Sequence, residues 1–222
     1  VSTIEPNRSL APDESQVFFL QKEMAQAQVR IEFATGVYDE KKAPAGQLFN
    51  EYFGGGMAGL VFQELREARA LAYSAWAHYF NPARPNEENI LVGAIGCQAD
   101  KTLDAVEAFM DLLEKMPINE TRWQSAHSSI LSTYRTNPIG YRSTPSFVYD
   151  VNTLGLSGDP RKNRYEILRK AEINLLEEFY EREIQTRAKL LSIVGDSAKI
   201  DLDKLSEFGP VKKVSAEKLF TR

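Results

Sequence analysis

The sequence predicts an α+β fold rather than a doubly wound parallel sheet. Its strand-like segments come in pairs that short turns can join, and the turn at 81–86 contains two prolines that a central strand could not accommodate. Long helical segments follow these pairs in blocks, which is the arrangement of α+β domains. With 222 residues, the chain is long enough to bury roughly 70% of its unfolded surface.

Six segments have the pattern of strands. Apolar and polar residues alternate at 29–33, as in a half-buried strand. The segment 90–97 is apolar on both faces, which predicts a central, covered strand. The six segments are 17–20, 29–33, 71–81, 90–97, 190–194 and 211–214.

The predicted strand at 71–81 is rich in aromatic residues. Alternation in a strand puts every second side chain on the same face. One face is therefore predicted to carry Tyr73, Ala75, Ala77 and Tyr79, and the other Ser74, Trp76, His78 and Phe80.

Helices are predicted where apolar residues recur every three or four positions. Asp100 and Asn119 stand at the starts of two of them, where side-chain oxygens cap free backbone amides. The predicted helices are 43–53, 58–70, 103–113, 119–134, 161–187 and 202–205, with a looser helical stretch up to residue 156.

The domain organisation is predicted to be simple. Residues 1–15 are polar, contain two prolines and have no periodicity, so they are expected to form a linker. Residues 16–222 show no internal repeat and are expected to form a single domain.

Composition limits the functional classes. The net charge of −4 gives no electrostatic reason to expect nucleic acid as a partner. No apolar run approaches the roughly 20 residues of a transmembrane helix, so no membrane segment is expected, and the cellular compartment stays open. The single cysteine, Cys97, excludes an internal disulfide.

The sequence offers no convincing metal ligands and no convincing catalytic nucleophile. A catalytic zinc usually has three protein ligands, often histidines three or four positions apart on a helix. The two histidines, His78 and His127, are far apart in the sequence, and a structural role is favoured for His127. Cys97 lies in an apolar strand, where a thiol behaves as a small hydrophobic side chain.

The glycine cluster at 54–56 precedes a helix, as a phosphate-binding loop does. It follows a helix rather than a strand, however, and lacks the Gly-Lys-Ser/Thr ending of a nucleotide loop. A tight corner between two helices is therefore the favoured interpretation.

Arg66 and Tyr73 are the candidate functional pair. Taken alone, Arg66 between two glutamates is typical of a solvated helix residue, and Tyr73 of an amphipathic residue at the edge of a core. An arginine at the end of a helix and a tyrosine early in the next strand can nevertheless converge on one side of a sheet. There a cation and a phenol can hold a peptide carbonyl or an oxyanion.

The segment FGGGMAGLVFQELREARALAYSAWAHY resembles the glycine-to-LR-x6-Y block of the insulinase/pitrilysin-type zinc metallopeptidases. The order of elements is similar across nearly the whole chain. The H-x-x-E-H motif of the zinc-binding half is missing, because residues 36–42 lead directly into AGQLFNEYFGGG. The chain therefore resembles the C-terminal, non-metal-binding half of such an enzyme.

This resemblance implies the fold, the partner and the role. It implies an antiparallel or mixed sheet with helices mainly on one face, and a homologous zinc-bearing half on the same polypeptide or another subunit. No cofactor is expected in this chain, and zinc is expected in the partner half. Arg66 and Tyr73 match the residues that contact the peptide substrate across the closed chamber. By itself the chain is expected to be inactive.

Two alternatives stay open at this point. One is a non-catalytic structural or assembly subunit of the same fold. The other is a module that binds extended peptides at a sheet edge.

Overall fold

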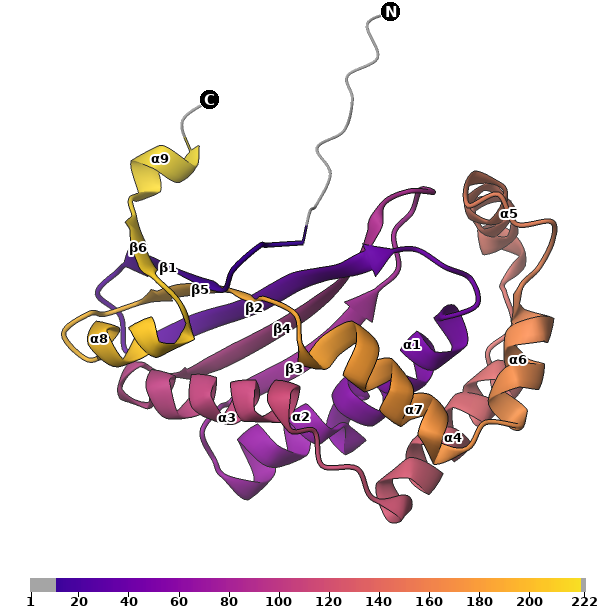
Figure 1. The fold of residues 1–222 in the computed structure, drawn as a ribbon, viewed down its shortest axis with the longest axis horizontal. Helices are drawn as coiled ribbons and strands as arrows, with labels where there is room; N and C mark the ends of the chain where they lie inside the picture. Colours follow the sequence, from indigo (N-terminus) through magenta and orange to yellow (C-terminus); the bar gives the residue numbers. More distant parts are fainter. Residues whose placement is uncertain (1–10, 221–222) are drawn as a thin grey trace, which may run out of the picture.

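The computed structural model describes residues 11–220 and contains a six-stranded sheet (Figure 1). The strands lie in the order β3-β4-β2-β5-β1-β6. They are β1 (Gln16–Gln21), β2 (Gln26–Val37), β3 (Ser74–Phe80), β4 (Glu88–Gln98), β5 (Leu190–Gly195) and β6 (Val211–Val214).

The sheet is mixed. β2 is antiparallel to both β4 and β5, and β3 is antiparallel to β4. β1 is parallel to β5 on one side and to β6 on the other. The α+β class and the mixed sheet that the family resemblance implied are both confirmed.

The helices gather mainly on one face of this sheet, as Figure 1 shows. α1, α2 and α7 each continue as wider, π-helical turns, at Asn50–Gly54, Gln63–Ala68 and Tyr180–Gln185. The α-helices are α1 (Ala43–Phe49), α2 (Leu60–Phe62), α3 (Thr102–Glu114), α4 (Glu120–Thr136), α5 (Thr144–Thr153), α6 (Arg161–Arg169), α7 (Ile173–Phe179), α8 (Leu202–Leu205) and α9 (Ala216–Phe220). None of the helices in the described part of the chain is long and apolar enough to span a membrane.

The local signals at the helix starts had different outcomes. Asn119 accepts a hydrogen bond from the amide of Arg122 at 2.9 Å, so the predicted cap of α4 is confirmed. The predicted cap at Asp100 is wrong. That residue lies inside the 3₁₀ turn Ala99–Lys101, and α3 begins after Lys101 without a side-chain cap.

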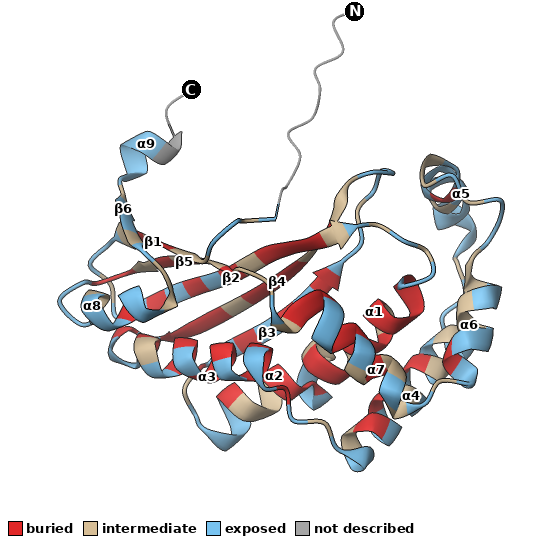
Figure 2. Cartoon of the chain, in the orientation of Figure 1, coloured by how far each residue is buried: buried red, intermediate tan, exposed pale blue. Residues whose placement is uncertain are grey.

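The core lies between the sheet and the helices, where buried positions cluster (Figure 2). The rings of Phe49 and Phe53 stack with centroids 5.0 Å apart, and Phe109 meets Phe53 edge-on at 6.1 Å. Gly93 on β4 lets Phe109 approach the sheet, because a Cβ at that glycine would lie 2.3 Å from the ring. The aromatic layer therefore depends on small residues in the strand beneath it.

The glycine cluster is the tight corner that the sequence favours. A Cβ on Gly54 would lie 1.9 Å from the carbonyl oxygen of Ala77 on β3, and Gly56 has φ of +58°. Asn50, one turn earlier, hydrogen-bonds both the amide and the carbonyl of Tyr79 at 2.6 and 2.9 Å. The helix end thus packs against the outer edge of β3 and occupies backbone groups that an added strand would need.

The predicted linker is described only in part. Residues 1–10 lie outside the described residues, and 11–15 have no regular structure. The division into a linker at 1–15 and one domain at 16–222 stays a prediction.

Candidate functional site

Tyr73 lies on the face of the sheet that the helices leave open. Its ring and the hydroxyl of Ser74 occupy the space above Gly96, where a Cβ would meet either side chain within 2.7 Å. The neighbours of Gly96 on β4, Ile95 and Cys97, face the core instead. The side chain of Tyr73 is therefore directed away from the helices, and the residue is 44% exposed.

The prediction that Tyr73 shares a face with Ala75, Ala77 and Tyr79 is wrong. β3 begins at Ser74, and the amide of Tyr73 bonds the carbonyl of Gly96 out of the regular register. This irregularity interrupts the alternation one residue before the strand. The rest of β3 alternates as predicted, with Ala75 buried and Trp76 exposed.

The hydroxyl of Tyr73 is oriented by Gln28 on β2. The side-chain amide of Gln28 donates a hydrogen bond to this hydroxyl at 2.5 Å. A phenol that accepts one hydrogen bond still has its own O–H to donate. Tyr73 can therefore present a donor to a ligand on the open face while Gln28 holds it in place.

Arg66 lies in the π-helical turn that follows α2 and is free of strong ion pairs. Its guanidinium lies over the ring of Phe62 at 4.8 Å from the centroid, and its Nε is 3.6 Å from Glu67. The side chain is 47% exposed. A guanidinium supported by an aromatic ring and loosely paired to one carboxylate remains able to bind a carbonyl or carboxylate.

The structure does not bring Arg66 and Tyr73 into contact. Among the described residues, no hydrogen bond joins them, and each has its own neighbours. Both are exposed, and seven positions of chain separate them through the turn at Ala70. A ligand that touches both would have to bridge this turn.

Ala70 ends the helix that carries Arg66 in a left-handed conformation, with φ of 50°. Such a conformation costs an L-residue roughly 1–2 kcal/mol, whereas glycine adopts it freely. Ala70→Gly should therefore raise the free energy of unfolding by up to about 1 kcal/mol, after the larger unfolded-state entropy of glycine is counted. Equilibrium unfolding in urea measures this change in the free energy of unfolding. The matched control Ala68→Gly, at an exposed helical position, should lower stability by about 1 kcal/mol, and equal effects of the two would contradict the account.

Aromatic side chains on β3 extend the open face beyond Tyr73. Trp76 and Phe80 are 45% and 46% exposed, and the ring of His78 packs edge-on against Phe80 at 4.4 Å. Partial burial lowers the pKa of His78, so this ring is neutral at pH 7. The open face thus offers exposed aromatic rings along β3, polar groups at Tyr73 and Gln28, and the Arg30–Glu32 ion pair on β2.

The described part of the chain contains no arrangement of side chains that fits a zinc ion. In residues 11–220, no group of three or more His, Cys, Asp or Glu side chains has the arrangement of a metal site. His127 stacks on Trp123 and contacts the carbonyl of Leu168 at 2.7 Å, which is the structural role favoured from the sequence. Cys97 is fully buried, and burial raises the pKa of its thiol, which disfavours the thiolate that a nucleophile needs.

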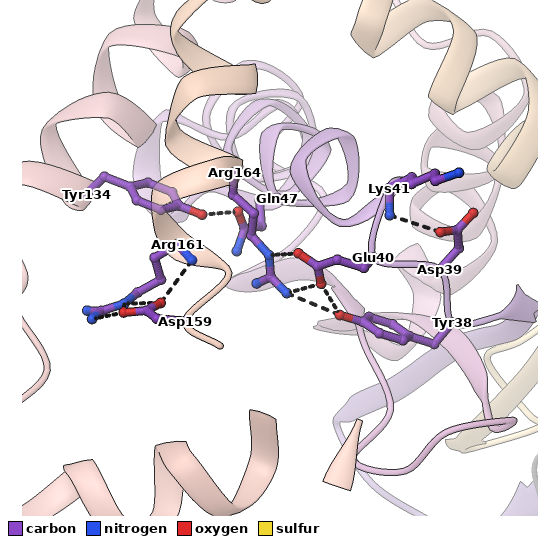
Figure 3. Close-up of polar contacts among 9 residues, drawn as sticks. All are labelled: Tyr38, Asp39, Glu40, Lys41, Gln47, Tyr134, Asp159, Arg161 and Arg164. Atoms are coloured by element: carbon purple, nitrogen blue, oxygen red, sulfur yellow. Dashed lines mark hydrogen bonds and ion pairs between the residues drawn. The ribbon is translucent and has the colours of Figure 1, made fainter. Parts of the chain in front are cut away.

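A second polar cluster, missed by the sequence reasoning, joins the loop after β2 to α6 (Figure 3). Arg164 donates two hydrogen bonds to the carboxylate of Glu40, at 2.7 and 2.5 Å, and a third to Tyr38 at 3.1 Å. Tyr38 in turn donates to Glu40. Burial, together with the hydrogen bond to the carboxylate, raises the pKa of Tyr38 to about 12. The loop and the helix are thereby fixed to each other.

This cluster makes stability depend on pH. Burial alone would raise the pKa of Glu40, but hydrogen bonds from Arg164 and Tyr38 outweigh it and lower the pKa. The carboxylate therefore stabilises the fold above the unfolded pKa of about 4.3, and this contribution is lost as pH falls through the lower folded value. Glu40→Gln should cost about 2 kcal/mol at pH 7, between exposed and buried pairs, and less at pH 3. Denaturant titrations of the parent and the variant at both pH values measure this loss of stability. A loss that is the same at both pH values would contradict the role of the Glu40 carboxylate.

The fold and the site together define a class: an α+β domain with the architecture of a metallopeptidase half and no metal site in its described part. The family model "Peptidase M16 inactive domain" matches residues 3–124, more than half of the chain. The chain therefore belongs to this family. The resemblance to a C-terminal, non-metal half is thereby confirmed, and an inactive domain agrees with the missing H-x-x-E-H motif.

Solved structures share the fold at low sequence identity. The peptidase M16 inactive domain from Pseudomonas fluorescens has a TM-score of 0.73 and 11% identity, over 86% of this chain and 46% of that one. A protease from Helicobacter pylori has a TM-score of 0.70 and 11% identity, over 87% and 48%. A conserved protein from Enterococcus faecalis V583 has 0.69 and 14%, over 87% and 45%. No curated protein sequence matches.

The chain spans less than half the length of each of these three structures.

Proposed function

We propose that this chain is the non-zinc half of a two-half zinc metallopeptidase, closes its chamber and contacts the peptide substrate. The observation that carries this proposal is the open sheet face, where the oriented hydroxyl of Tyr73 and the exposed rings of Trp76 and Phe80 on β3 are accessible. A soluble domain rarely leaves such a surface uncovered unless a partner or ligand uses it. Membership in an inactive-domain family supports a zinc-bearing half as that partner.

In this proposal the zinc half supplies the hydrolytic chemistry and this chain supplies binding and hydrogen-bond donors. The O–H of Tyr73 donates to a backbone carbonyl of the peptide or to the oxyanion that develops from it. Arg66 adds a fixed positive charge at the same substrate, and the aromatic rings of Trp76 and Phe80 contact its apolar side chains. The open face then forms the wall opposite the zinc site.

The test is hydrolysis of a quenched peptide library by the zinc-bearing half, measured with and without this chain. Cleavage that needs both components supports the proposal. Cleavage by the zinc half alone, unchanged on addition, would show instead a structural or assembly subunit.

A free-standing peptide-binding module is the less favoured candidate. Addition of a peptide strand at β3 would compete with Asn50, which already occupies the amide and carbonyl of Tyr79. Such a module would bind peptide saturably without the zinc half and would not be affected by Arg66→Ala.

A further inference from the structure

A cleft of about 850 Å³ opens on the helical side of the molecule, away from the open sheet face. α1, the end of α4 and the first turn of α6 line it, and Phe147 of α5 forms another wall. A smaller hollow of about 410 Å³ adjoins it and shares several of its residues. This size is in the range of pockets that hold small organic ligands. Figure 3 shows five of the lining residues, namely Gln47, Tyr134, Asp159, Arg161 and Arg164.

The cleft carries an excess of positive charge in a chain whose net charge is negative. Four cations line it, namely Arg135, Arg161, Lys162 and Arg164, against the single carboxylate of Asp159. Asp159 is paired with Arg161 at 2.5 Å, and Arg164 is paired with Glu40. Within residues 11–220, Arg135 and Lys162 have no carboxylate within 4.0 Å. Arg135 donates one hydrogen bond, from Nε to the hydroxyl of Tyr165 at 3.1 Å. Its terminal guanidinium N–H groups and the ammonium of Lys162 are therefore the groups available to an anion.

Aromatic rings alternate with these cations. The guanidinium of Arg135 lies 5.9 Å from the ring centroid of Tyr165, and that of Arg161 lies 5.1 Å from the ring of Phe147. Tyr134 and Tyr165 lie 6.0 Å apart, centroid to centroid. Pro138 and Ile139 add apolar surface. A planar apolar body fits such walls, and guanidinium groups above aromatic rings also present a flat face to it.

The geometry points to a binding site, in this cleft, for a small organic anion with a planar, apolar body. Its acid group pairs with Arg135 and Lys162, and its body lies against Phe147 and Tyr165. The site is separate from the open sheet face and does not depend on the proposed peptidase role.

Two dyes that differ only in charge test this inference on the folded chain. Anilinonaphthalene sulfonate is a planar aromatic anion, and N-phenylnaphthylamine is the same body without the sulfonate. The fluorescence titration should show saturable binding of the sulfonate, at least about tenfold tighter than that of the neutral dye, because a charged group forms the stronger hydrogen bonds.

The variants locate the dye. The double variant Arg135→Gln/Lys162→Gln should weaken sulfonate binding about tenfold and leave the neutral dye unchanged. Lys115→Gln/Lys170→Gln removes the same charge at exposed positions outside the cleft and should change neither dye. Phe147→Ser should weaken both dyes. Equal affinity for the two dyes, sulfonate binding that survives the cleft variant, or binding lost in Trp76→Ser would overturn the inference.

Discussion

Replacement of Gly54 by alanine should lower the free energy of unfolding by about 3 kcal/mol or more. The new methyl group would lie 1.9 Å from the carbonyl oxygen of Ala77, a distance at which either the helix end or β3 must move. Overpacking against flexible side chains typically costs about 1–3 kcal/mol, and a strand backbone yields less than a side chain does. Equilibrium denaturation followed by circular dichroism measures the loss.

Two other glycines provide matched controls for the same substitution. Gly56 has φ of +58° and open space around its Cβ position, so Gly56→Ala should cost about 1 kcal/mol from backbone strain alone. Gly158 has open space around its Cβ position and no positive φ. Gly158→Ala should therefore change the free energy of unfolding by no more than about 0.5 kcal/mol. The expected order of cost is Gly54, Gly56, Gly158. A Gly54 variant as stable as the Gly158 variant would refute the close packing of this corner against β3.

Removal of the donors at the proposed substrate site should cost the assembled enzyme on the order of 100-fold in kcat for each residue. Tyr73→Phe removes only the hydroxyl, and Arg66→Ala removes the guanidinium. Both side chains are exposed. The free energy of unfolding of each variant should therefore lie within about 1 kcal/mol of that of the parent. KM should change less than kcat, because a hydrogen bond that strengthens in the transition state acts mainly on the chemical step.

Neighbouring residues serve as controls for this effect. Arg69→Ala removes an exposed arginine of the same turn, and Tyr149→Phe removes a hydroxyl from the exposed helix α5. Neither should change the rate of peptide hydrolysis. Near-normal rates from both Tyr73→Phe and Arg66→Ala would remove these residues from the substrate site, even if the two halves still assemble.

Local features of the fold could be predicted from the sequence because local physics determines them. The cap at Asn119 and the alternation in β2 depend on neighbouring residues only, and both predictions are confirmed. The order of the strands in the sheet could not be predicted in this way. β1 lies beside β5 in parallel, and a pairing between such distant segments leaves no periodic signal in either of them.

In the candidate site, too, local features could be predicted from the sequence and long-range contacts could not. Arg66 and Tyr73 were found through their spacing, and their role stays a prediction. The face on which Tyr73 lies was predicted wrongly, because the irregular bond to Gly96 interrupts the alternation. Gln28, the partner of Tyr73, was missed, since identifying it needs the register across three strands. Its only sequence signal was a polar residue in an alternating strand. Gly96, which permits the close approach, lies beside Gln28 only in the folded sheet.

The cleft was also invisible in the sequence. Its walls come from α1, the end of α4, the segment with α5 that follows, and α6, and only the tertiary fold brings Arg135 near Tyr165. The sequence from Pro138 to Leu156 indicated no more than a loose helical stretch.

The central claim is that the open sheet face meets the peptide inside the chamber. Benzoylphenylalanine, a photo-crosslinking residue, can replace Trp76 on this face or Tyr149 on the outer helix α5, both of them exposed in the isolated chain. Each variant is assembled with a catalytically inactivated zinc half and irradiated with a labelled peptide. The account predicts capture of the peptide at position 76 and none at 149. Capture at 149, or none at 76 although the halves assemble, would contradict it.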